Sequence, residues 1–396
     1  MQVRSVEFCS EEIVVGVRLC SPRLRCVCGY ATRASYDRRR RRWRHLDVGG
    51  WRCFIEMDVR RLVCPYCGVR TEMVPFARPG ARHTRGFEAL VVWAASHLDK
   101  TRAGELCRVA WETVDAIVAR VVAESLEESR LSGLRRIGVD ERSWRRRRAM
   151  TVVVDHDSGR VVWVGQGARA ETLSRFFEEI GPESAAGIEV VTMDMGRAYR
   201  KAVEALEPTP AICFDPFHVM VLATRALDTL RRRVAASLRL DPRSQRGLRW
   251  ALVTSGAQLS PARLAALDSL RADRHVLWRA WVLKEELADL YRLDDPSSAS
   301  AYLQRWLARA SRSRIPAMVL LARTIRNHFE GIVKAVELGL SNSRLEGFNS
   351  KIALLNHRGY GYHSPQALTA MIYLTCGPVV LPPLWTPTST PSTSAA

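Results

Sequence analysis

The sequence lacks the segments that would place the protein in or across a membrane. No stretch reaches the ~20 consecutive apolar residues that a membrane-spanning helix needs. The first residues, MQVRSVEFCSEE, have acids where a secretion signal has an apolar core, so we expect no such signal. We therefore expect a cytoplasmic, nucleoid-associated protein without a membrane partner.

Acidic residues are few relative to basic ones. The chain of 396 residues has 60 Lys and Arg against 41 Asp and Glu, which gives a net charge of +19. Hydrophobic residues make up 47%, which is typical of a globular protein, and the length suits two to four domains. A positive excess of this size favours nucleic acid as the partner.

Four of the ten cysteines form two close pairs, Cys26-Val-Cys28 and Cys64-Pro-Tyr-Cys67. In an intracellular chain such pairs bind zinc more often than they form disulfides. The single residue between the first two is a tight spacing for a tetrahedral site. Other residues could replace one of them, namely Cys20, His45 or Cys53. The alternative is a small β-domain with reduced, packed cysteines.

A helix-turn-helix is predicted within residues 85–130, in the segment AGELCRVAWETVDAIVARVV. Leu106 closes the first helix, and Trp111 begins the second, whose apolar residues recur at helical spacing. Recognition helices contact bases from their first residues, while flanking basic side chains contact phosphate. The candidates for DNA contact are Arg108, Trp111, Glu112, Thr113, Asp115 and Arg120, joined by the basic run Arg38–Arg42.

From residue 134 the pattern changes to short β-rich runs followed by alternating helices and strands. The predicted order is β-β-β-α-β-α-β, which is typical of a ribonuclease-H-like sheet. Residues 217–338 are predicted to be almost entirely helical, and most of their tryptophans, such as Trp250 and Trp306, are expected in the core. The tail PPLWTPTSTPSTSAA is expected to be disordered.

Two acids end neighbouring strands of this predicted sheet. Asp140 ends the first β run and Asp194 the fourth, so their carboxylates should meet at one edge, where Mg²⁺ could bind. Two such ions support in-line displacement at phosphate. Asp215, with His218 three residues on, could replace Asp194 or support the site. Glu141 should point to the opposite face of its strand.

The best third acid is Glu346, in SNSRLEGFNSKIALL. The apolar residues of this segment are spaced as in an amphipathic helix, and Glu346 lies off that face with Asn342 and Asn349 nearby. The spacing Ser343-x-x-Glu346 is equally that of a capping box, in which the glutamate closes the start of a helix. Spacing alone leaves the cap and the ligand equally possible.

Several segments together resemble the bacterial insertion-sequence transposases of the ISL3 family. They are RHLDVGGWRCFIE and RRLVCPYCGVRTEMVPFA, IGVDERSW and TVVVDHDSGRVV, VVTMDMGRAY, CFDPFHVM, and SNSRLEGFNSKIALLNHRGYGYHS. The resemblance runs from about residue 26 to residue 375.

The resemblance implies an α/β fold. Its ribonuclease-H-like (retroviral-integrase-like) core is interrupted by an all-helical insertion and preceded by a helix-turn-helix and a small zinc-ribbon-like domain. The implied domains are 1–78 (ribbon), 79–132 (helix-turn-helix), 133–216 (core, first part), 217–338 (insertion), 339–378 (final core helices) and 379–396 (tail).

The resemblance also implies the site. The catalytic triad would be Asp140, Asp194 and Glu346, holding two Mg²⁺ (or Mn²⁺) ions with DNA bound. Zn²⁺ would be held by Cys26, Cys28, Cys64 and Cys67. Supporting residues would be Asp215, His218, Asn342, Asn349 and Lys351.

The run Arg145, Arg146, Arg147 and Arg148 is expected in a hairpin after the first strand of the core, beside the acids, where it would neutralise DNA phosphate. A merely solvated face is the alternative. The expected function is therefore cleavage and strand transfer of double-stranded DNA, at element ends and target, by a homodimer or higher oligomer. The alternatives are an inert, transposase-derived DNA-binding regulator and a structure-selective nuclease.

Overall fold

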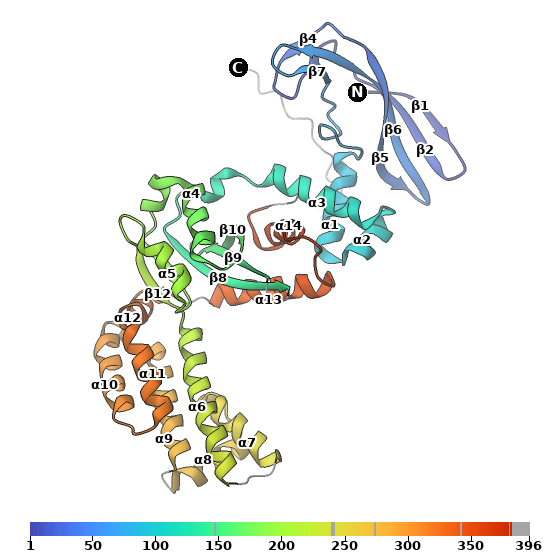
Figure 1. Cartoon of the computed structure of the whole chain (residues 1–396). Helices are drawn as coiled ribbons and strands as arrows, with labels where there is room; N and C mark the ends of the chain where they lie inside the picture. The colour runs from blue at the N-terminus through green and yellow to red at the C-terminus, as the bar shows by residue number, and fades with distance from the viewer. Residues whose placement is uncertain (146–147, 239–241, 273–274, 341–342, 380, 382–396) are drawn as a thin grey trace. The chain divides into compact units, whose positions relative to one another are not determined.

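The computed structural model describes the chain except residues 146–147, 239–241, 273–274, 341–342, 380 and 382–396, and it leaves some neighbouring side chains undescribed. The described chain forms two compact units (Figure 1). The first comprises Met1–Glu127 and His357–Thr375, and the second comprises Glu128–Asn356 and Cys376–Pro378. No described helix is long and apolar enough to cross a membrane.

The first unit begins with a mixed β-sheet. Its strand order is β1-β2-β6-β5, and β7 pairs with β6. The strands are β1 (Gln2–Phe8), β2 (Glu12–Arg18), β5 (Arg38–Val48), β6 (Trp51–Cys64) and β7 (Gly68–Thr71), with the small pair β3 (Leu24–Arg25) and β4 (Ala31–Thr32). Between Cys53 and Val59 of β6 every second residue is buried, so that Ile55, Met57 and Val59 pack against Trp43. The other face of β6 carries the charged residues Glu56 and Asp58.

Three helices follow, which agree with the predicted helix-turn-helix. They are α1 (Arg85–His97), α2 (Lys100–Cys107) and α3 (Trp111–Ser125). The side chain of Asp99 caps α2 by accepting from the Arg102 N–H. The turn between α2 and α3 is tight, because Arg108 has φ 55° and a Cβ on Gly104 would lie 2.7 Å from the Val109 carbonyl oxygen. Glycine at position 104 therefore permits the turn.

The C-terminal helix α14 (Pro365–Cys376) lies, apart from its last residue, in the first unit. The His363 ring lies 5.3 Å from that of Trp111, the Lys100 ammonium lies 4.3 Å from the ring of buried Tyr362, and Arg358 donates to the Ala95 carbonyl. The resemblance implies 339–378 as final core helices, and that division stays a prediction. A fragment that ends near residue 130 would lack the contacts that residues 358–363 make with α1, α2 and α3.

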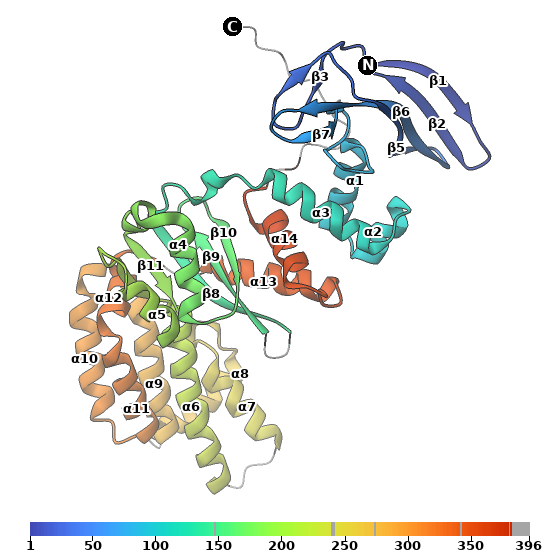
Figure 2. The same cartoon turned by 45° about the horizontal axis from the view of Figure 1, so that its top comes forward.

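The sheet of the second unit has the order β10-β9-β8-β11-β12 (Figure 2). Its strands are β8 (Arg136–Arg145), β9 (Arg148–Asp155), β10 (Arg160–Gln166), β11 (Val190–Met193) and β12 (Ala211–Phe214). The first three are antiparallel, and β11 runs parallel to both β8 and β12. The order of strands and helices matches the sequence prediction. One detail was wrong: Asp140 does not end its strand, because β8 continues to Arg145 in a hairpin with β9.

Helices α4 (Ala170–Ala186) and α5 (Arg197–Glu204) contribute to the core of this sheet. Ile137, Val139 and Met193 from the strands are buried with Leu173 and Phe176 of α4. These strand residues alternate with those on the opposite face, so the even-numbered residues of β8, Asp140 among them, point away from α4.

The predicted helical region is confirmed between β12 and α13 (Ser343–Arg358). Its helices are α6 (Pro216–Leu238), α7 (Pro242–Val253), α8 (Pro261–Ala272), α9 (Val276–Asp289), α10 (Ala299–Ser311), α11 (Pro316–Asn327) and α12 (Phe329–Glu337), with short 3-10 turns. Helix α12 packs closely on β12, since a Cβ on Gly331 would lie 2.6 Å from the Phe214 ring. Trp306 is buried as expected, whereas Trp250 is 47% exposed.

Candidate functional site

Three aspartates share one row at the edge of the second sheet. The pairing of β8 with β11 matches Gly138 with Thr192, and continuing this register brings Asp140 opposite Asp194. The pairing of β11 with β12 matches Met193 with Phe214, so Asp215 follows beside Asp194. Parallel strands of equal register therefore bring three carboxyl-bearing residues to one edge, as was predicted for Asp140 and Asp194.

Asp140 is held by two donors. Its Oδ1 accepts from the Glu141 N–H at 2.8 Å, and its Oδ2 accepts from the side-chain amide of Asn349 on α13. Burial raises the pKa of Asp140, whereas the hydrogen bonds from Asn349 and Glu141 and the nearby His218 lower it. The neighbouring charge of Asp194 raises it again. A second carboxylate whose charge acts on Asp140 favours a bound cation.

Asp194 depends on the glycine two residues later. Its Oδ1 accepts from the Gly196 N–H at 2.9 Å, and a Cβ on Gly196 would lie 2.8 Å from the same oxygen. Only glycine allows this approach without a shift of the carboxylate. The Asp194 side chain is half-buried.

Asp215 is buried at the start of α6, and each of its carboxylate oxygens has a partner. Its Oδ1 accepts from the Phe217 N–H at 3.3 Å, and its Oδ2 lies 3.2 Å from Nδ1 of His218. The hydrogen bond to Asp215 raises the pKa of His218 although burial opposes this, and the charges of Asp140 and Asp194 raise it further. His218 therefore faces the carboxylate row with a raised pKa, which is compatible with the supporting role predicted for this pair.

Helix α13 contributes Asn349 to the row. Arg142 of β8 donates to the Asn349 carbonyl at 2.8 Å, and Asn356 donates to the Trp144 carbonyl at 3.1 Å, so two turns of α13 are bonded to β8. The Asn349 Oδ1 is buried and has no hydrogen-bond partner among the described residues. An unpaired buried oxygen beside a carboxylate suits a hard cation or its water.

The predicted third acid lies one helical turn before Asn349. The backbone of Glu346 belongs to α13, but its side chain and that of Ser343 lie outside what the structure describes, as does Asn342. Both the ligand and the cap therefore stay predictions. Lys351 is exposed, with its ammonium 5.5 Å from the Phe348 ring.

Sequence reasoning missed Tyr199 of α5, which lies close to the carboxylates. Its buried hydroxyl is 2.9 Å from the Thr151 hydroxyl of β9. Burial raises the pKa of Tyr199, and the charges of Glu141, Asp140 and Asp194 raise it further. The signal was present in VVTMDMGRAY, where the tyrosine lies five residues after Asp194.

A second cluster lies in the first unit, where Cys26, Cys28, Cys64 and Cys67 come together. Their sulfur atoms all lie within 4.8 Å of one another, and those of Cys28 and Cys64 are 3.5 Å apart. Zn–S bonds of about 2.3 Å in a tetrahedron require sulfur separations of about 3.8 Å, so the four thiols fit zinc. The one-residue spacing of the first pair is accommodated, and neither Cys20, His45 nor Cys53 belongs to the cluster.

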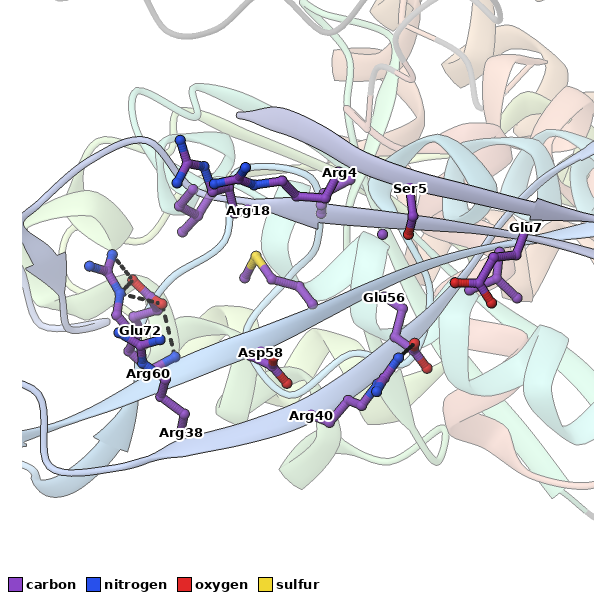
Figure 3. Close-up of a pocket in the computed structure, with 15 residues that line it drawn as sticks. Arg4, Ser5, Glu7, Arg18, Arg38, Arg40, Glu56, Asp58, Arg60 and Glu72 are labelled. Carbon is purple, nitrogen blue, oxygen red and sulfur yellow. Dashed lines mark hydrogen bonds and ion pairs between the residues drawn. The ribbon is translucent and has the colours of Figure 1, made fainter.

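The basic run Arg38–Arg42 lies on β5, where it is partly neutralised. Arg40 pairs with Glu56 of β6, and Arg42 pairs with Glu12 of β2 at 2.7 Å. The charged face of this sheet forms a hollow of about 450 Å³, in which the Arg60–Glu72 pair also lies (Figure 3). Acids and arginines thus alternate here, which lowers the net charge that DNA would meet.

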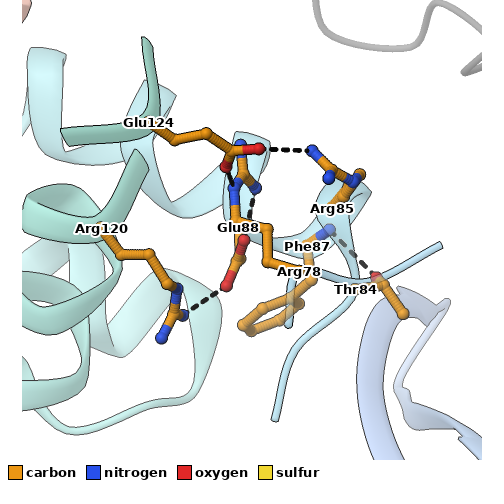
Figure 4. A network of polar contacts seen from close by, with 7 residues as sticks. All are labelled: Arg78, Thr84, Arg85, Phe87, Glu88, Arg120 and Glu124. Carbon is orange, nitrogen blue, oxygen red and sulfur yellow. Dashed lines mark hydrogen bonds and ion pairs between the residues drawn. The ribbon is translucent and has the colours of Figure 1, made fainter. Parts of the chain in front are cut away.

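The candidate recognition helix α3 is held by a buried ion-pair network (Figure 4). Glu88 of α1 is fully buried and pairs with Arg78 at 2.5 Å and with Arg120 of α3. Glu124 also pairs with Arg78, and with Arg85 at 3.2 Å.

Two more of the predicted DNA contacts in this region are engaged within the chain. Arg108 donates to the Gly50 carbonyl at 2.8 Å, and Asp115 pairs with Lys100. Trp111 and Glu112 are exposed and Thr113 is half-buried. The assignment of base and backbone contacts therefore stays a prediction.

The two ends of the predicted arginine run, Arg145 and Arg148, lie at the end of the β8–β9 hairpin. Arg145 pairs with Arg148 in the strand register, and the Arg148 guanidinium lies 5.8 Å from the Trp144 ring. Arg146 and Arg147 lie outside the described residues, as does the side chain of Arg145. Their contact with DNA stays a prediction.

Comparison with known proteins gives three family matches in chain order. Residues 26–67 match the zinc-finger of transposase IS204/IS1001/IS1096/IS1165. Residues 72–122 match the helix-turn-helix domain of transposase family ISL3, and residues 137–372 match the ISL3 DDE transposase family.

Curated relatives agree with these matches. The chain is 38% identical over 408 residues to the transposase for insertion sequence element IS1557 of Mycobacterium tuberculosis, covering 94% of this chain and 92% of the relative. It is 29% identical over 348 residues to the transposase for insertion sequence element IS1001 of Bordetella parapertussis, covering 86% and 85%.

Proposed function

This chain belongs to the ISL3 family of transposases, and we propose that it binds the inverted repeats of its own insertion sequence and cuts and joins DNA there. The observation that carries the proposal is the carboxylate row. Asp140 and Asp194 stand side by side at the edge of two parallel strands, with the amide of Asn349 bonded to Asp140.

We propose that the second unit is a ribonuclease-H-like core interrupted by a helical insertion. The strand order β10-β9-β8-β11-β12 with two parallel crossovers supports this. The core would span 133–216 and resume at 339, with 217–338 as the insertion. Residues 1–78 and 79–132 would form the ribbon and the helix-turn-helix, and 379–396 the tail.

The catalytic residues in this proposal are Asp140, Asp194 and Glu346. Their carboxylates would hold Mg²⁺ (or Mn²⁺), which when bound supplies a Lewis acid for phosphate displacement by water or a 3′-hydroxyl. The chain's own contribution is orientation. Asn349 fixes one oxygen of Asp140, and the Gly196 N–H fixes one oxygen of Asp194.

The supporting residues keep the charges of the site in balance. Asp215 orients His218, and the charges of Asp140, Asp194 and Asp215 favour the protonated form of its ring, which would offset the repulsion between these acids and the DNA phosphate. We propose that Tyr199 adds a fixed hydroxyl behind the row by bonding Thr151.

We propose that the four-cysteine cluster holds one structural zinc ion. The close spacing of the four sulfur atoms supports this, as does a core of only a few residues, Leu24 and Leu62 with the buried cysteines. So small a core needs a metal to fold stably. Zinc would thereby fix the ribbon that precedes the helix-turn-helix.

The partner in this proposal is double-stranded DNA, at the element's ends and at the target. The α2–α3 turn supports recognition by α3, and the charge of +19 supports phosphate binding. Because an element has two ends that undergo the same reaction, we propose a homodimer or higher oligomer on DNA in the nucleoid.

The test uses full-length protein and a duplex carrying the element's inverted repeat. Asp140→Ala, Asp194→Ala and Glu346→Ala should each abolish Mg²⁺-dependent cleavage and leave end binding nearly unchanged. Wild-type protein that binds ends but never cleaves them would mean a DNA-binding regulator. Hydrolysis without joining of a 3′-hydroxyl end would mean a structure-selective nuclease. Full activity in Glu346→Ala would leave that glutamate as a cap.

A further inference from the structure

The helical region carries an exposed basic face that the proposed catalytic site does not use. We call it the α7 surface and define it by Arg232 of α6 and Arg246, Arg249 and Trp250 of α7. All four are exposed. Helices α6 and α7 lie next to each other in both views (Figures 1 and 2).

Basic residues strongly outnumber acids around this surface. Residues 225–272 contain ten arginines and three aspartates, with no lysine or glutamate. Asp228 pairs with Arg231 and Arg232 at 2.8 Å and lies 4.0 Å from Arg249, so one acid is shared by three arginines across α6 and α7. The surface keeps a net positive charge, which is complementary to a polyanion.

Trp250 is the feature that simple phosphate binding does not explain. It is 47% exposed, whereas Trp306 of the same region is buried and Trp278 and Trp281 stack on each other at 5.1 Å. The Arg249 guanidinium lies 5.7 Å from the Trp250 ring. An exposed indole among arginines presents a flat apolar face that a planar partner can cover. Nucleic-acid bases are such partners, because every base has a π-face.

We propose that the α7 surface is a second DNA-binding site, which takes DNA with unpaired bases, its arginines binding phosphate and Trp250 stacking on a base. A paired duplex covers each internal base with its neighbours, so away from the duplex ends only an opened or frayed strand can offer a face to the indole. The proposal rests on the proposed function only in that strand cleavage at an element end would generate such DNA.

The experiment compares two DNAs of the same random sequence, a blunt duplex and a fork with unpaired ends. Full-length protein is titrated by fluorescence anisotropy. Omitting Mg²⁺ and Mn²⁺ prevents cleavage, and the random sequence prevents inverted-repeat recognition. Trp250→Ala should reduce fork affinity roughly tenfold, the scale expected for one stacked base, and leave duplex affinity within a factor of about two. Trp250→Phe should keep most of the fork preference.

Two controls separate stacking from other effects. Leu264→Ala removes an equally exposed apolar side chain of α8 that has no π-face, and it should change neither affinity. Arg246→Gln and Arg249→Gln should weaken both DNAs alike, each lowering the slope of log affinity against log salt by about 0.7 to 0.9. Circular dichroism should show that all variants are folded.

The results that overturn the proposal are distinct. Unchanged fork affinity in folded Trp250→Ala, or an equal loss in Leu264→Ala, excludes base stacking. A change of oligomeric state in Trp250→Ala by light scattering, with both DNA affinities unchanged, makes the surface an interface between copies instead. Failure of the proposed catalysis would leave the fork preference intact, because the assay needs no cleavage.

Discussion

Replacing Asn349 with Ala tests whether α13 tunes the carboxylate row. The amide of Asn349 donates to Oδ2 of Asp140 and is one of two hydrogen bonds that lower the pKa of that carboxyl against burial. The alanine variant removes this donor and leaves the Glu141 N–H in place. Because a protonated Asp140 cannot hold Mg²⁺, the change should appear in the pH dependence of cleavage.

The expected magnitude follows from the hydrogen bond. A hydrogen bond to a charged group contributes about 1.5–3 kcal/mol, and one pKa unit corresponds to about 1.36 kcal/mol. Losing the amide should therefore raise the pKa of Asp140 further, because burial is then opposed by one hydrogen bond fewer. The sign is fixed: activity falls as the pH drops through this pKa, so the acidic limb of the variant moves to higher pH. At a pH well above the raised pKa, the cleavage rate of the variant should approach that of wild type.

The assay measures the cleavage rate of an inverted-repeat duplex against pH at limiting Mg²⁺. Asn356→Ala is the matched control, because Asn356 makes a similar bond from α13 to β8 but to the Trp144 carbonyl instead of a carboxylate. It should leave the pH profile in position. An unshifted limb in Asn349→Ala, or an equal shift in Asn356→Ala, would show that the helix merely packs against β8.

Three further changes test other parts of the molecule. Gly196→Ala should reduce cleavage at least tenfold with DNA binding retained, because its Cβ would crowd Oδ1 of Asp194; wild-type rates would refute the proposed constraint. Cys64→Ser should lose the roughly one zinc per chain expected by elemental analysis and unfold the N-terminal region alone, whereas metal-free wild-type protein with an ordered ribbon would exclude zinc. Glu88→Ala should destabilise α1–α3 by about 3 kcal/mol, since it leaves Arg78 and Arg120 without their buried partner; unchanged hydrogen exchange there would contradict this.

The strand order of the core could be predicted because its apolar runs are short, regular and separated by clear helices. The end of β8 could not. The apolar run stops at Val139, but the strand continues to Arg145 through residues that alternate in a solvated hairpin with β9. A β-strand needs only backbone pairing to continue, so the loss of apolar residues marks the end of the buried part and not the end of the strand.

Long-range partners were beyond the sequence. Nothing near Trp111 indicates that His363 packs against it, and nothing near Arg120 indicates that the fully buried Glu88 pairs with it. Charge shows that a chain suits DNA, but which arginines remain available depends on acids brought near by folding. The cysteine pairs were informative for the opposite reason, since four thiols have few other common uses in a reduced chain.

The chain has a net charge of +19, yet the acids of its carboxylate row make the binding of DNA and the binding of metal depend on each other. The row of Asp140 and Asp194 repels phosphate, and the phosphate that the arginines attract in turn favours a divalent cation at the row. Each ligand therefore supplies charge that the other needs, and coupling between binding sites is reciprocal. Mg²⁺ should thus bind more tightly when the end DNA is present, and DNA held by the arginines should approach the row closely only when the metal is there. Cleavage would then depend on both, which keeps a basic DNA-binding protein from cutting wherever it binds.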